Sequence, residues 1–320
     1  MQSRKKSISK IKIGSSKFSI IPKSLIIKPQ KNIPWLSTHA GACYVEILDK
    51  KNYKAKVYIS GRDKDNKSRI GTAIISFKNK KPKILKINKI PVLDISKNIG
   101  YFDTDGVLYP EILKIKKKKF LYYCGWLNAK SFNYTCNIGL ASEKNGKFKR
   151  VLKAPLFNIN DIDPIGTASF SIIKIKNKFI MYYTSFNPWK IKKGILVHNY
   201  FIKIAISSDG LNWKREGKIA LGLKKDEIAV AKPSVFKLNG KICIFFSARK
   251  KNYSIFFAES SDGIKFKRFQ NKLKLGSGKW SSESQCYPAY VDFDNKKFLL
   301  YCGNNYGKSG IGYAEIKLSN

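Results

Sequence analysis

Acidic residues of this chain gather at one point of an internal repeat. Five segments share a pattern of a strand, a short turn rich in Lys, Asn or Gly, and an aromatic strand. Aligned on that first strand, the copies place these polar residues within about eight residues before it: His39, Asp103 with Asp105, Asp163, Asp226 with Glu227, and Glu283. Carboxylates held close together raise the pKa of one member, so that one donates a proton and the other acts as base or nucleophile. Cleavage of a glycosidic bond requires such a pair.

Each of these acids also has an ordinary structural explanation. Asp163 precedes a proline and Asp226 follows two lysines, positions typical of turns or surface ion pairs. Asp103 and Asp105 lie in FDTDGV, where an Asx turn completed by the glycine is an alternative to catalysis. The segments around the two glutamates show less turn chemistry, which favours a functional role. The candidate catalytic residues are therefore Asp103, Glu227 and Glu283.

Other side chains in and around the repeat fit the binding of a sugar. His39 lies in WLSTHAG beside Trp35, as a sugar contact or as a packed structural histidine. Tryptophans at strand ends offer a flat face to a sugar ring, although buried structural aromatics have the same signature. Basic residues near strand ends suit an anionic sugar or phosphate, or ordinary ion pairs. The expected substrate-binding residues are His39, Arg62, Asp63, Asp105, Trp126, Lys232, Arg249, Tyr287 and Asn304.

The repeat also predicts the elements that position these residues. Its two-strand units are spaced by roughly 55 to 65 residues: YVEILDKKNYKAKVYIS, YPEILKIKKKKFLYYCG, SFSIIKIKNKFIMYYTS, KPSVFKLNGKICIFFSA and YPAYVDFDNKKFLLYCG. A weaker hairpin follows each unit, in three copies with an NG or DG turn. Four strands per unit, five units and no convincing helix predict an all-β fold, a five-bladed β-propeller with four-stranded blades. A β-sandwich or β-solenoid shares the alternation but does not explain five copies of a two-hairpin unit.

The ends of the chain suggest how the propeller closes. The last repeat stops after its third strand, so the apolar stretch 18–27 is expected to supply the missing outer strand. The predicted organisation is an N-terminal segment, 1–30, that closes the last blade, and a propeller domain, 31–320. In a propeller the innermost strands line a central channel, so residues at the start of those strands should converge there.

Composition and charge indicate which partners, cofactors and cellular location to expect. The net charge of +42 comes mostly from Lys spread through every segment, which fits either a solvated surface or an anionic partner. No nucleic-acid-binding motif is present, so nucleic acid is a disfavoured partner. Six Cys stand singly in apolar runs without metal-ligand spacing, so no metal or cofactor is expected and a reducing compartment is indicated. Without a signal peptide or a membrane-spanning stretch, the expected location is cytoplasmic.

Several motifs resemble those of bacterial five-bladed propeller proteins related to glycoside hydrolase families 43, 32 and 130. The resemblance covers roughly residues 30–315 and rests on WLSTHAG, GRDKDNKSRIG, YFDTDGV, AISSDGLNW, VAKPSV, AESSDGIKF, SESQCYP and GNNYGKSGIGYA. It implies that Asp103 is base or nucleophile, that Glu227 or Glu283 is the acid, and that the remaining carboxylate tunes their pKa. Members of that group place an Asp at the start of the first blade, where this chain has Thr38, His39 and Ala40.

The resemblance and the residues together predict a glycosidase-like, carbohydrate-active enzyme. Because of the departure at His39, phosphorolysis and glycosyl transfer in surface-polysaccharide metabolism remain open beside hydrolysis. The expected substrate is a carbohydrate or an anionic sugar, such as a nucleotide sugar, a lipid-linked precursor or a phosphorylated glycan. A non-catalytic glycan-binding propeller and a basic nucleic-acid-binding propeller are the alternatives.

Overall fold

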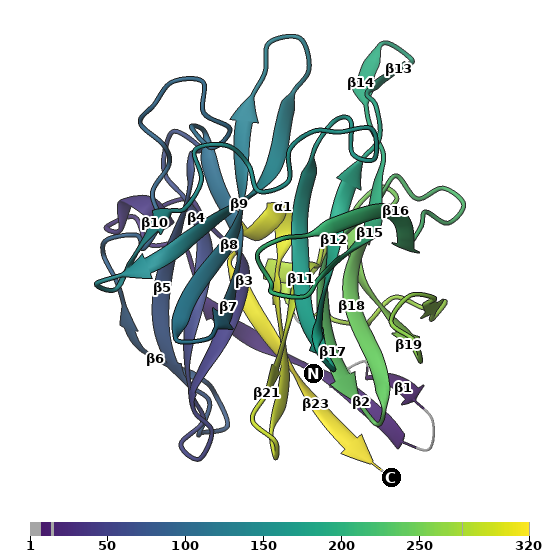
Figure 1. Cartoon of the computed structure of the whole chain (residues 1–320). Helices are drawn as coiled ribbons and strands as arrows, with labels where there is room; N and C mark the ends of the chain where they lie inside the picture. The colour runs from purple at the N-terminus through teal and green to yellow at the C-terminus, as the bar shows by residue number, and fades with distance from the viewer. Residues whose placement is uncertain (1–7, 14–15, 277, 320) are drawn as a thin grey trace.

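Strands account for almost every element of the computed structural model, which describes residues 8–13, 16–276 and 278–319 (Figure 1). The all-β class predicted from the repeat is confirmed. The first antiparallel group contains β3 (His39–Asp49), β4 (Lys54–Arg62), β5 (Ser68–Ser76) and β6 (Lys83–Ile87). The second contains β7 (Gly106–Ile115), β8 (Lys118–Asn128), β9 (Tyr134–Lys144) and β10 (Lys147–Arg150).

The remaining strands pair in the same manner. The third group contains β11 (Thr167–Ile175), β12 (Lys178–Phe186), β15 (Tyr200–Ser207) and β16 (Lys214–Leu221). The fourth contains β17 (Ala229–Leu238), β18 (Lys241–Arg249), β19 (Tyr253–Ser260) and β20 (Lys267–Arg268). The fifth contains β21 (Cys286–Asp292), β22 (Lys297–Cys302), β23 (Ile311–Ser319), β2 (Ser16–Ile27) and β1 (Ser9–Ile13).

Neighbouring groups touch through their strands to form larger curled sheets. A parallel pair, Ser68 with Gly106, joins the first two groups into one eight-stranded sheet. A second parallel pair, Tyr200 with Ala229, joins the third and fourth. Figure 1 shows the groups standing around the short element α1 (Asn304–Gly307), with the hairpin β13 (Lys190–Lys192) and β14 (Ile195–Val197) projecting at one end. Two short 3-10 turns, Pro34–Leu36 and Lys279–Ser281, complete the elements.

The first strand of every group carries a bulge at the same position. The pairing register shifts after Ala40, Leu108, Thr167, Ala231 and Cys286. In three of these strands the next residue has a left-handed backbone: Tyr109, Lys232 and Tyr287, with φ of 53°, 45° and 58°. A bulge leaves one residue of the strand without its usual ladder partner. Its backbone N–H must therefore find an acceptor elsewhere.

Side chains of the preceding group supply those acceptors. The N–H of Tyr109 donates to Ser60 Oγ (3.0 Å), that of Lys232 to Ser169 Oγ (2.8 Å), and that of Tyr287 to Ser247 Oγ (2.8 Å). A second tier lies further along the same strands. Its backbone N–H groups, from Ile172, Val235 and Tyr290, donate to Glu111 Oε1 (2.6 Å), Ser171 Oγ (3.2 Å) and Ser234 Oγ (2.9 Å). These bonds tie each group to the next at the centre of the molecule.

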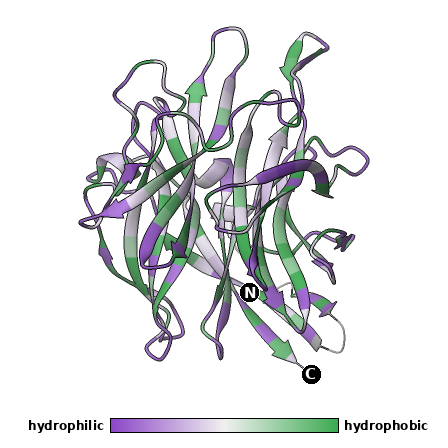
Figure 2. Ribbon diagram, viewed as in Figure 1, coloured by the Kyte–Doolittle hydropathy of each residue, from purple (hydrophilic) through white to green (hydrophobic). Residues whose placement is uncertain are grey.

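The two ends of the chain meet in one sheet. β2 runs antiparallel to β23, with Phe18 opposite Leu318 and Ile20 opposite Ile316. Phe18 is 1% exposed and its ring lies 5.4 Å from that of Phe257, edge to face. Because Phe257 belongs to the fourth group, β2 packs across the boundary between two groups. Green, white and purple residues are interspersed along the strands in Figure 2, while most turns are hydrophilic. No described helix is long and apolar enough to cross a membrane.

Truncating Phe18 tests whether this contact holds the sheets together. Phe18→Ala removes a buried ring and leaves a cavity against Phe257, so we expect a loss of about 3 to 5 kcal/mol in the free energy of unfolding. Guanidinium unfolding followed by tryptophan fluorescence measures it. The control is Lys17→Ala, at an exposed position of the same strand. Equal stability of the two variants would show that β2 contributes little to the closure.

Candidate functional site

A large cavity opens at the end of the sheets from which the β13–β14 hairpin projects. Its volume is about 1290 Å³, and its wall combines residues from the starts of first strands, the ends of second strands and the starts of third strands. Antiparallel pairing brings these three positions to the same end of each group. The main polar and aromatic lining residues are Arg62, Tyr109, Trp126, Tyr134, Trp189, His198, Tyr200, Glu227, Arg249, Tyr253, Tyr287 and Tyr306.

Several tyrosines surround one arginine in this wall. The guanidinium of Arg249 lies 5.2 Å from the ring centre of Tyr253 and 3.5 Å from the hydroxyl of Tyr306. The hydroxyls of Tyr200 and Tyr253 are hydrogen-bonded to each other. Burial raises the pKa of Tyr253, so its hydroxyl stays protonated and able to donate. A guanidinium beside such hydroxyls offers a set of donors for an anionic or heavily hydroxylated ligand.

Tyr134, Tyr200 and Tyr253 were not predicted from the sequence, although a signal was present. Tyr134, Tyr200 and Tyr253 are each the first residue of the third strand of their group. Aligning the repeats on the third strand, rather than on the first, brings them to one position. Arg62 and Arg249 likewise share a place, at the end of the second strand, and both had been predicted as binding residues.

Four residues that line this cavity each have a buried polar atom without a protein hydrogen-bond partner. Trp126 Nε1, Trp189 Nε1, His198 Nε2 and Arg249 Nε are all buried and make no hydrogen bond to a described residue. All four residues line the cavity. Buried polar groups are normally paired, because leaving one unpaired costs about 1 to 3 kcal/mol. The cluster therefore has the character of a site that a polar ligand completes.

His198 stands inside a box of aromatic rings. Its ring centre is 3.8 Å from that of Trp189, 5.1 Å from Tyr200 and 5.0 Å from Phe186. Burial, together with the charge of Arg249, lowers the pKa of His198 to about 4. The imidazole is thus neutral at neutral pH and presents a polar nitrogen without adding charge.

The charge of the lining is predominantly positive. Arg62, Lys190, Lys192 and Arg249 contribute guanidinium and ammonium groups, and the described lining carboxylates are Asp226 and Glu227. Both carboxylates have basic partners. Asp226 lies 3.6 Å from Lys250, and Glu227 accepts two hydrogen bonds from Arg268 at 2.6 and 2.9 Å.

Three of the predicted acids, Asp103, Asp163 and Glu227, each form an ion pair with an arginine of their own group. Asp103 Oδ2 accepts from Arg150 (2.6 Å) and Tyr123 (2.9 Å), and Asp163 Oδ2 accepts from Arg215 (2.8 Å) and Tyr183 (2.9 Å). Glu227 does the same with Arg268. The arginines lie on β10, β16 and β20, the last strands of the second, third and fourth groups. This arrangement anchors the loop before the first strand to the outer strand.

The structure does not bring the three predicted catalytic acids together in the cavity wall. All three are described, and Glu227 alone belongs to the lining. Asp103 is fully buried, with its second oxygen lacking a protein partner, and Glu283 is exposed. The contacts of Asp103 and Glu227 are those of structural ion pairs. The sequence had suggested this alternative for Asp163 and Asp226, an Asx turn for Asp103, and a functional role for Glu227. Their catalytic roles stay predictions.

The expected substrate-binding residues divide into two sets. Arg62, Trp126, Arg249 and Tyr287 line the cavity. Three others lie outside the lining. The carboxylate of Asp63 accepts a hydrogen bond from Arg69. Asp105 accepts one from the backbone N–H of Asn128 (2.8 Å), and the side-chain oxygen of Asn304 accepts one from the backbone N–H of Glu283 (3.0 Å). These three contacts organise loops.

His39 lies beside the cavity rather than in its wall. Its Nδ1 is 2.9 Å from the hydroxyl of Thr38. Burial, followed by the charges of Arg62 and Lys308, lowers the pKa of His39 to about 4. The side chain is therefore neutral at neutral pH.

Two ionisable side chains lie buried on the first strands. Lys232 is 3% exposed, and its closest hydrogen-bond acceptor is the carbonyl of Pro233 at 3.5 Å. Burial lowers the pKa of Lys232, partly offset by Glu111. Burial likewise raises the pKa of Glu111 from 4.5 to about 7, although Lys232 acts in the opposite direction. The two groups therefore interact at a distance, without forming an ion pair. No described group of three or more His, Cys, Asp or Glu could hold a metal ion.

Removing the charge of Asp163 tests the anchoring role of the acids. Asp163→Asn leaves Arg215 and Lys203 without their buried counter-ion, so we expect a loss of about 3 to 5 kcal/mol in stability. Chemical unfolding of this variant is compared with that of Asp161→Asn, at an exposed position two residues away. A difference below about 1 kcal/mol would contradict a structural ion pair at this place.

Glu111 should make stability depend on pH. Its pKa in the folded chain, about 7, lies above the ordinary 4.5, so the folded state binds this proton more tightly. The resulting stabilisation is complete below pH 4.5 and lost as pH rises towards 7. We expect wild type to lose stability relative to Glu111→Gln across this interval, measured by unfolding at several pH values. Parallel curves would refute the assignment; Glu283→Gln, at an exposed site, is the control.

Known proteins resemble this chain in sequence and in structure. No family model matches the chain. An uncharacterized protein from Mycobacterium tuberculosis, found in strains H37Rv and CDC 1551, is 28% identical over 296 residues, covering 91% of this chain and 97% of the relative.

Solved structures are similar over most of the chain. A thermostable family-43 glycoside hydrolase superposes with a TM-score of 0.60 at 18% identity, covering 88% of each chain. A second similar structure comes from glycoside hydrolase family 130, a family of mannoside phosphorylases that contains glycoside hydrolases targeting β-1,2-mannosidic linkages in Candida mannan. Its TM-score is 0.66 at 16% identity, covering 97% of this chain and 93% of that one. A family-32 β-fructofuranosidase from Bombyx mori gives 0.56 at 13%, covering 87% of this chain and 61% of that one. The chain therefore shares the fold of the glycoside hydrolase-like propeller proteins of families 43, 32 and 130.

Proposed function

We propose that this chain is a carbohydrate-active protein that binds a negatively charged sugar in the central cavity and acts on its glycosidic bond. The reaction class is that of the glycosidases, with phosphorolysis or glycosyl transfer as variants on the same scaffold. In this proposal the five antiparallel groups are the blades of a five-bladed propeller with four-stranded blades. β2 is then the fourth strand of the last blade, with β1 paired to it as an additional edge strand, and residues 31–320 form the propeller domain.

The observation that carries the proposal is the set of buried polar atoms without partners. Trp126 Nε1, Trp189 Nε1, His198 Nε2 and Arg249 Nε come from different strands and loops and line one cavity. Sugars present many hydroxyl groups around a ring whose apolar face stacks on aromatic side chains. Indole rings of Trp126 and Trp189 suit such stacking and donate from their edges. A glycan would thus satisfy both the polar and the aromatic character of the wall.

The charge of the wall favours an anionic ligand. Arg62 and Arg249 occupy the same position of two blades, whereas the lining acids Asp226 and Glu227 already have basic partners. A phosphate or carboxylate would meet guanidinium groups in a partly dehydrated site, where charge-assisted hydrogen bonds are strong. Sugar phosphates, nucleotide sugars and lipid-linked phosphosugars all carry such a group. Lys232, buried on the first strand of the fourth blade, adds positive charge near the cavity wall.

Among the three predicted catalytic acids, Glu227 is the one that lines the cavity, which supports a catalytic role for it. Its carboxylate belongs to the lining and is held in a fixed orientation by Arg268. We propose it as the acid or base that faces the bond to be cleaved. Asp103 and Glu283 remain candidates for the complementary role through movement of their loops.

A non-catalytic glycan-binding protein is the second candidate. Its support is that both described lining carboxylates are ion-paired, which a binding protein tolerates more readily than an enzyme. The two candidates predict the same ligand and differ in turnover.

Ligand binding and turnover are tested together. Glucose 1-phosphate, UDP-glucose and neutral oligosaccharides are titrated into wild type by calorimetry, with release of reducing sugar and of phosphate assayed in parallel. We expect the charged ligands to bind and Arg249→Met to weaken them by roughly tenfold or more, since a hydrogen bond to a charged group contributes about 1.5 to 3 kcal/mol. Lys251→Met, at an exposed position, is the matched control.

The outcomes separate the candidates. Turnover lost in a folded Glu227→Gln variant supports the enzyme, and binding without turnover in any variant supports the glycan-binding protein. A preference for neutral sugars, unchanged by Arg249→Met, would refute the anionic substrate. Absence of binding to every sugar class would remove the carbohydrate proposal.

A further inference from the structure

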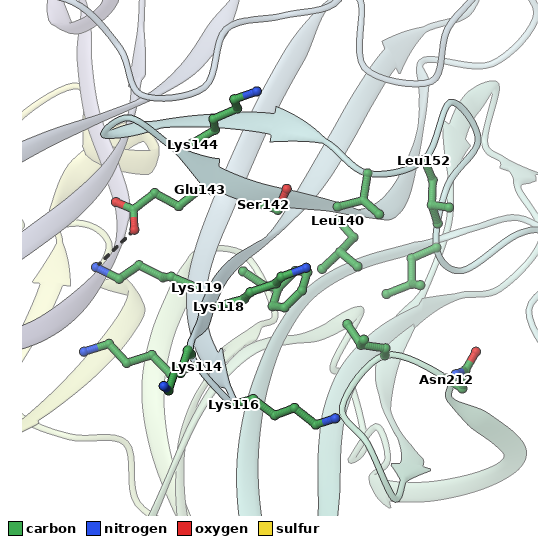
Figure 3. Close-up of a pocket in the computed structure, with 15 residues that line it drawn as sticks. Lys114, Lys116, Lys118, Lys119, Leu140, Ser142, Glu143, Lys144, Leu152 and Asn212 are labelled. Atoms are coloured by element: carbon green, nitrogen blue, oxygen red, sulfur yellow. Dashed lines mark ion pairs between the residues drawn. The ribbon is translucent and has the colours of Figure 1, made fainter.

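A second hollow, separate from the central cavity, lies between the second and third strand groups. Its volume is about 790 Å³. It is bordered by the turn between β7 and β8, the β9–β10 edge and the loop that contains Asn212 (Figure 3). β7 contributes Leu108 and Tyr109, near its start, to the central cavity, and Lys114, near its end, to this hollow. The two hollows therefore lie towards opposite ends of the same strand.

Lysines are the most frequent residues at the rim of this hollow, called the lysine groove below. They are Lys114, Lys116, Lys117, Lys118, Lys119 and Lys144. Lys114 and Lys119 are 3.2 and 3.1 Å from Glu46, and Lys119 is also 3.8 Å from Glu143, as the dashed line in Figure 3 marks. The other four form no ion pair with a described residue and are exposed. Four ammonium groups around this hollow therefore lack a counter-ion among the described residues.

The wall beyond the lysines is apolar. Leu140 and Phe120 are buried beneath it, and Leu156 and Leu211 are partly buried. Val151 and Leu152 stand at its edge with 46% and 40% of their surfaces exposed. Apolar side chains left in water beside a charged rim form an amphipathic surface.

We propose that this groove docks on a bilayer that contains anionic phospholipid. Four to eight clustered lysines are enough to hold a protein at such a surface, where each contributes about 1 kcal/mol. The lysines would meet the lipid phosphates, while Val151 and Leu152 enter the boundary between headgroups and acyl chains. Because the central cavity lies at the other end of β7, its mouth stays open to solvent when the groove is docked.

Nucleic acid fits the same lysines less well. Its readers favour arginine, which binds phosphate and bases through a planar fork, yet every basic residue of this rim is lysine. Its single-stranded forms stack on exposed aromatic rings, and Phe120, the aromatic residue of this lining, is 8% exposed. Exposed Val151 and Leu152 have no counterpart in a phosphate backbone. A lipid surface accounts for both the charge and the apolar edge.

Vesicle co-sedimentation tests the proposal with the whole chain. Phosphatidylcholine vesicles with and without phosphatidylglycerol are compared, and we expect binding only to the latter, weakening with salt. Replacing Lys116, Lys117, Lys118 and Lys144 by Gln should lower the partition coefficient at least about tenfold. The control replaces Lys80, Lys81, Lys83 and Lys86, four exposed lysines of the β5–β6 region, and should retain most of the binding.

Leu152→Ser separates docking from general attraction of a basic protein to an acidic surface. We expect it to lower binding several-fold at unchanged charge, since it removes an inserted apolar side chain. Equal losses in the two quadruple variants, or no effect of Leu152→Ser, would overturn the groove as the docking site. Failure of wild type to bind the acidic vesicles, or tighter binding to duplex DNA at equal phosphate concentration, would overturn the lipid surface as the partner.

Discussion

The bulge in each first strand is the constraint on which the rest of this structure depends. It turns Tyr109, Lys232 and Tyr287 into a left-handed backbone and leaves their N–H groups without a ladder partner. Hydroxyls of Ser60, Ser169 and Ser247 from the preceding groups receive those hydrogens. These bonds form only when adjacent groups stand at the correct distance and angle. At the centre of the molecule they accompany a buried apolar cluster to which the first strands of all five groups contribute, including Cys43, Leu108, Ala168, Ala231 and Cys286.

Electrostatic contacts fix the outside of the groups in a comparable way. An acid before the first strand binds an arginine at the last strand, as in Asp103 with Arg150 and Asp163 with Arg215. These pairs are buried at the acid, so each holds a loop in place at the cost of taking a carboxylate out of water. With so few acids in a basic chain, their use in these pairs leaves the cavity positive. The few carboxylates of the chain are thus used mainly in structural ion pairs rather than in the cavity wall.

The cavity gains its character from what remains unsatisfied. His198 and Trp189 come from the β13–β14 region, whereas Arg249 and Trp126 come from strand ends. All four residues line the same cavity, and each has one buried polar atom without a partner among the described residues. The lysine groove at the other end of β7 has a different composition, with flexible ammonium groups and aliphatic side chains in place of guanidinium and aromatic rings. Rigid, closely spaced donors suit a small ligand, and mobile charges beside an apolar edge suit an extended surface.

The all-β class, the positions of the hairpins, the apolar stretch 18–27 within β2, and the place of the acids before the first strands could all be predicted from the amino-acid sequence. These features are local, because strand alternation, turn residues and repeat spacing can be read within one copy. Arg62, Trp126, Arg249 and Tyr287, predicted to bind substrate, lie at repeated strand positions and line the cavity. The pairing of Asp103 with Arg150 becomes visible only in the folded chain. The same holds for Trp189 and His198, which join the wall from a hairpin that has no equivalent in the described strands of the other copies. Residues of different groups meet only when the sheets close around the centre, and a repeat shows that they are equivalent without showing which way they face.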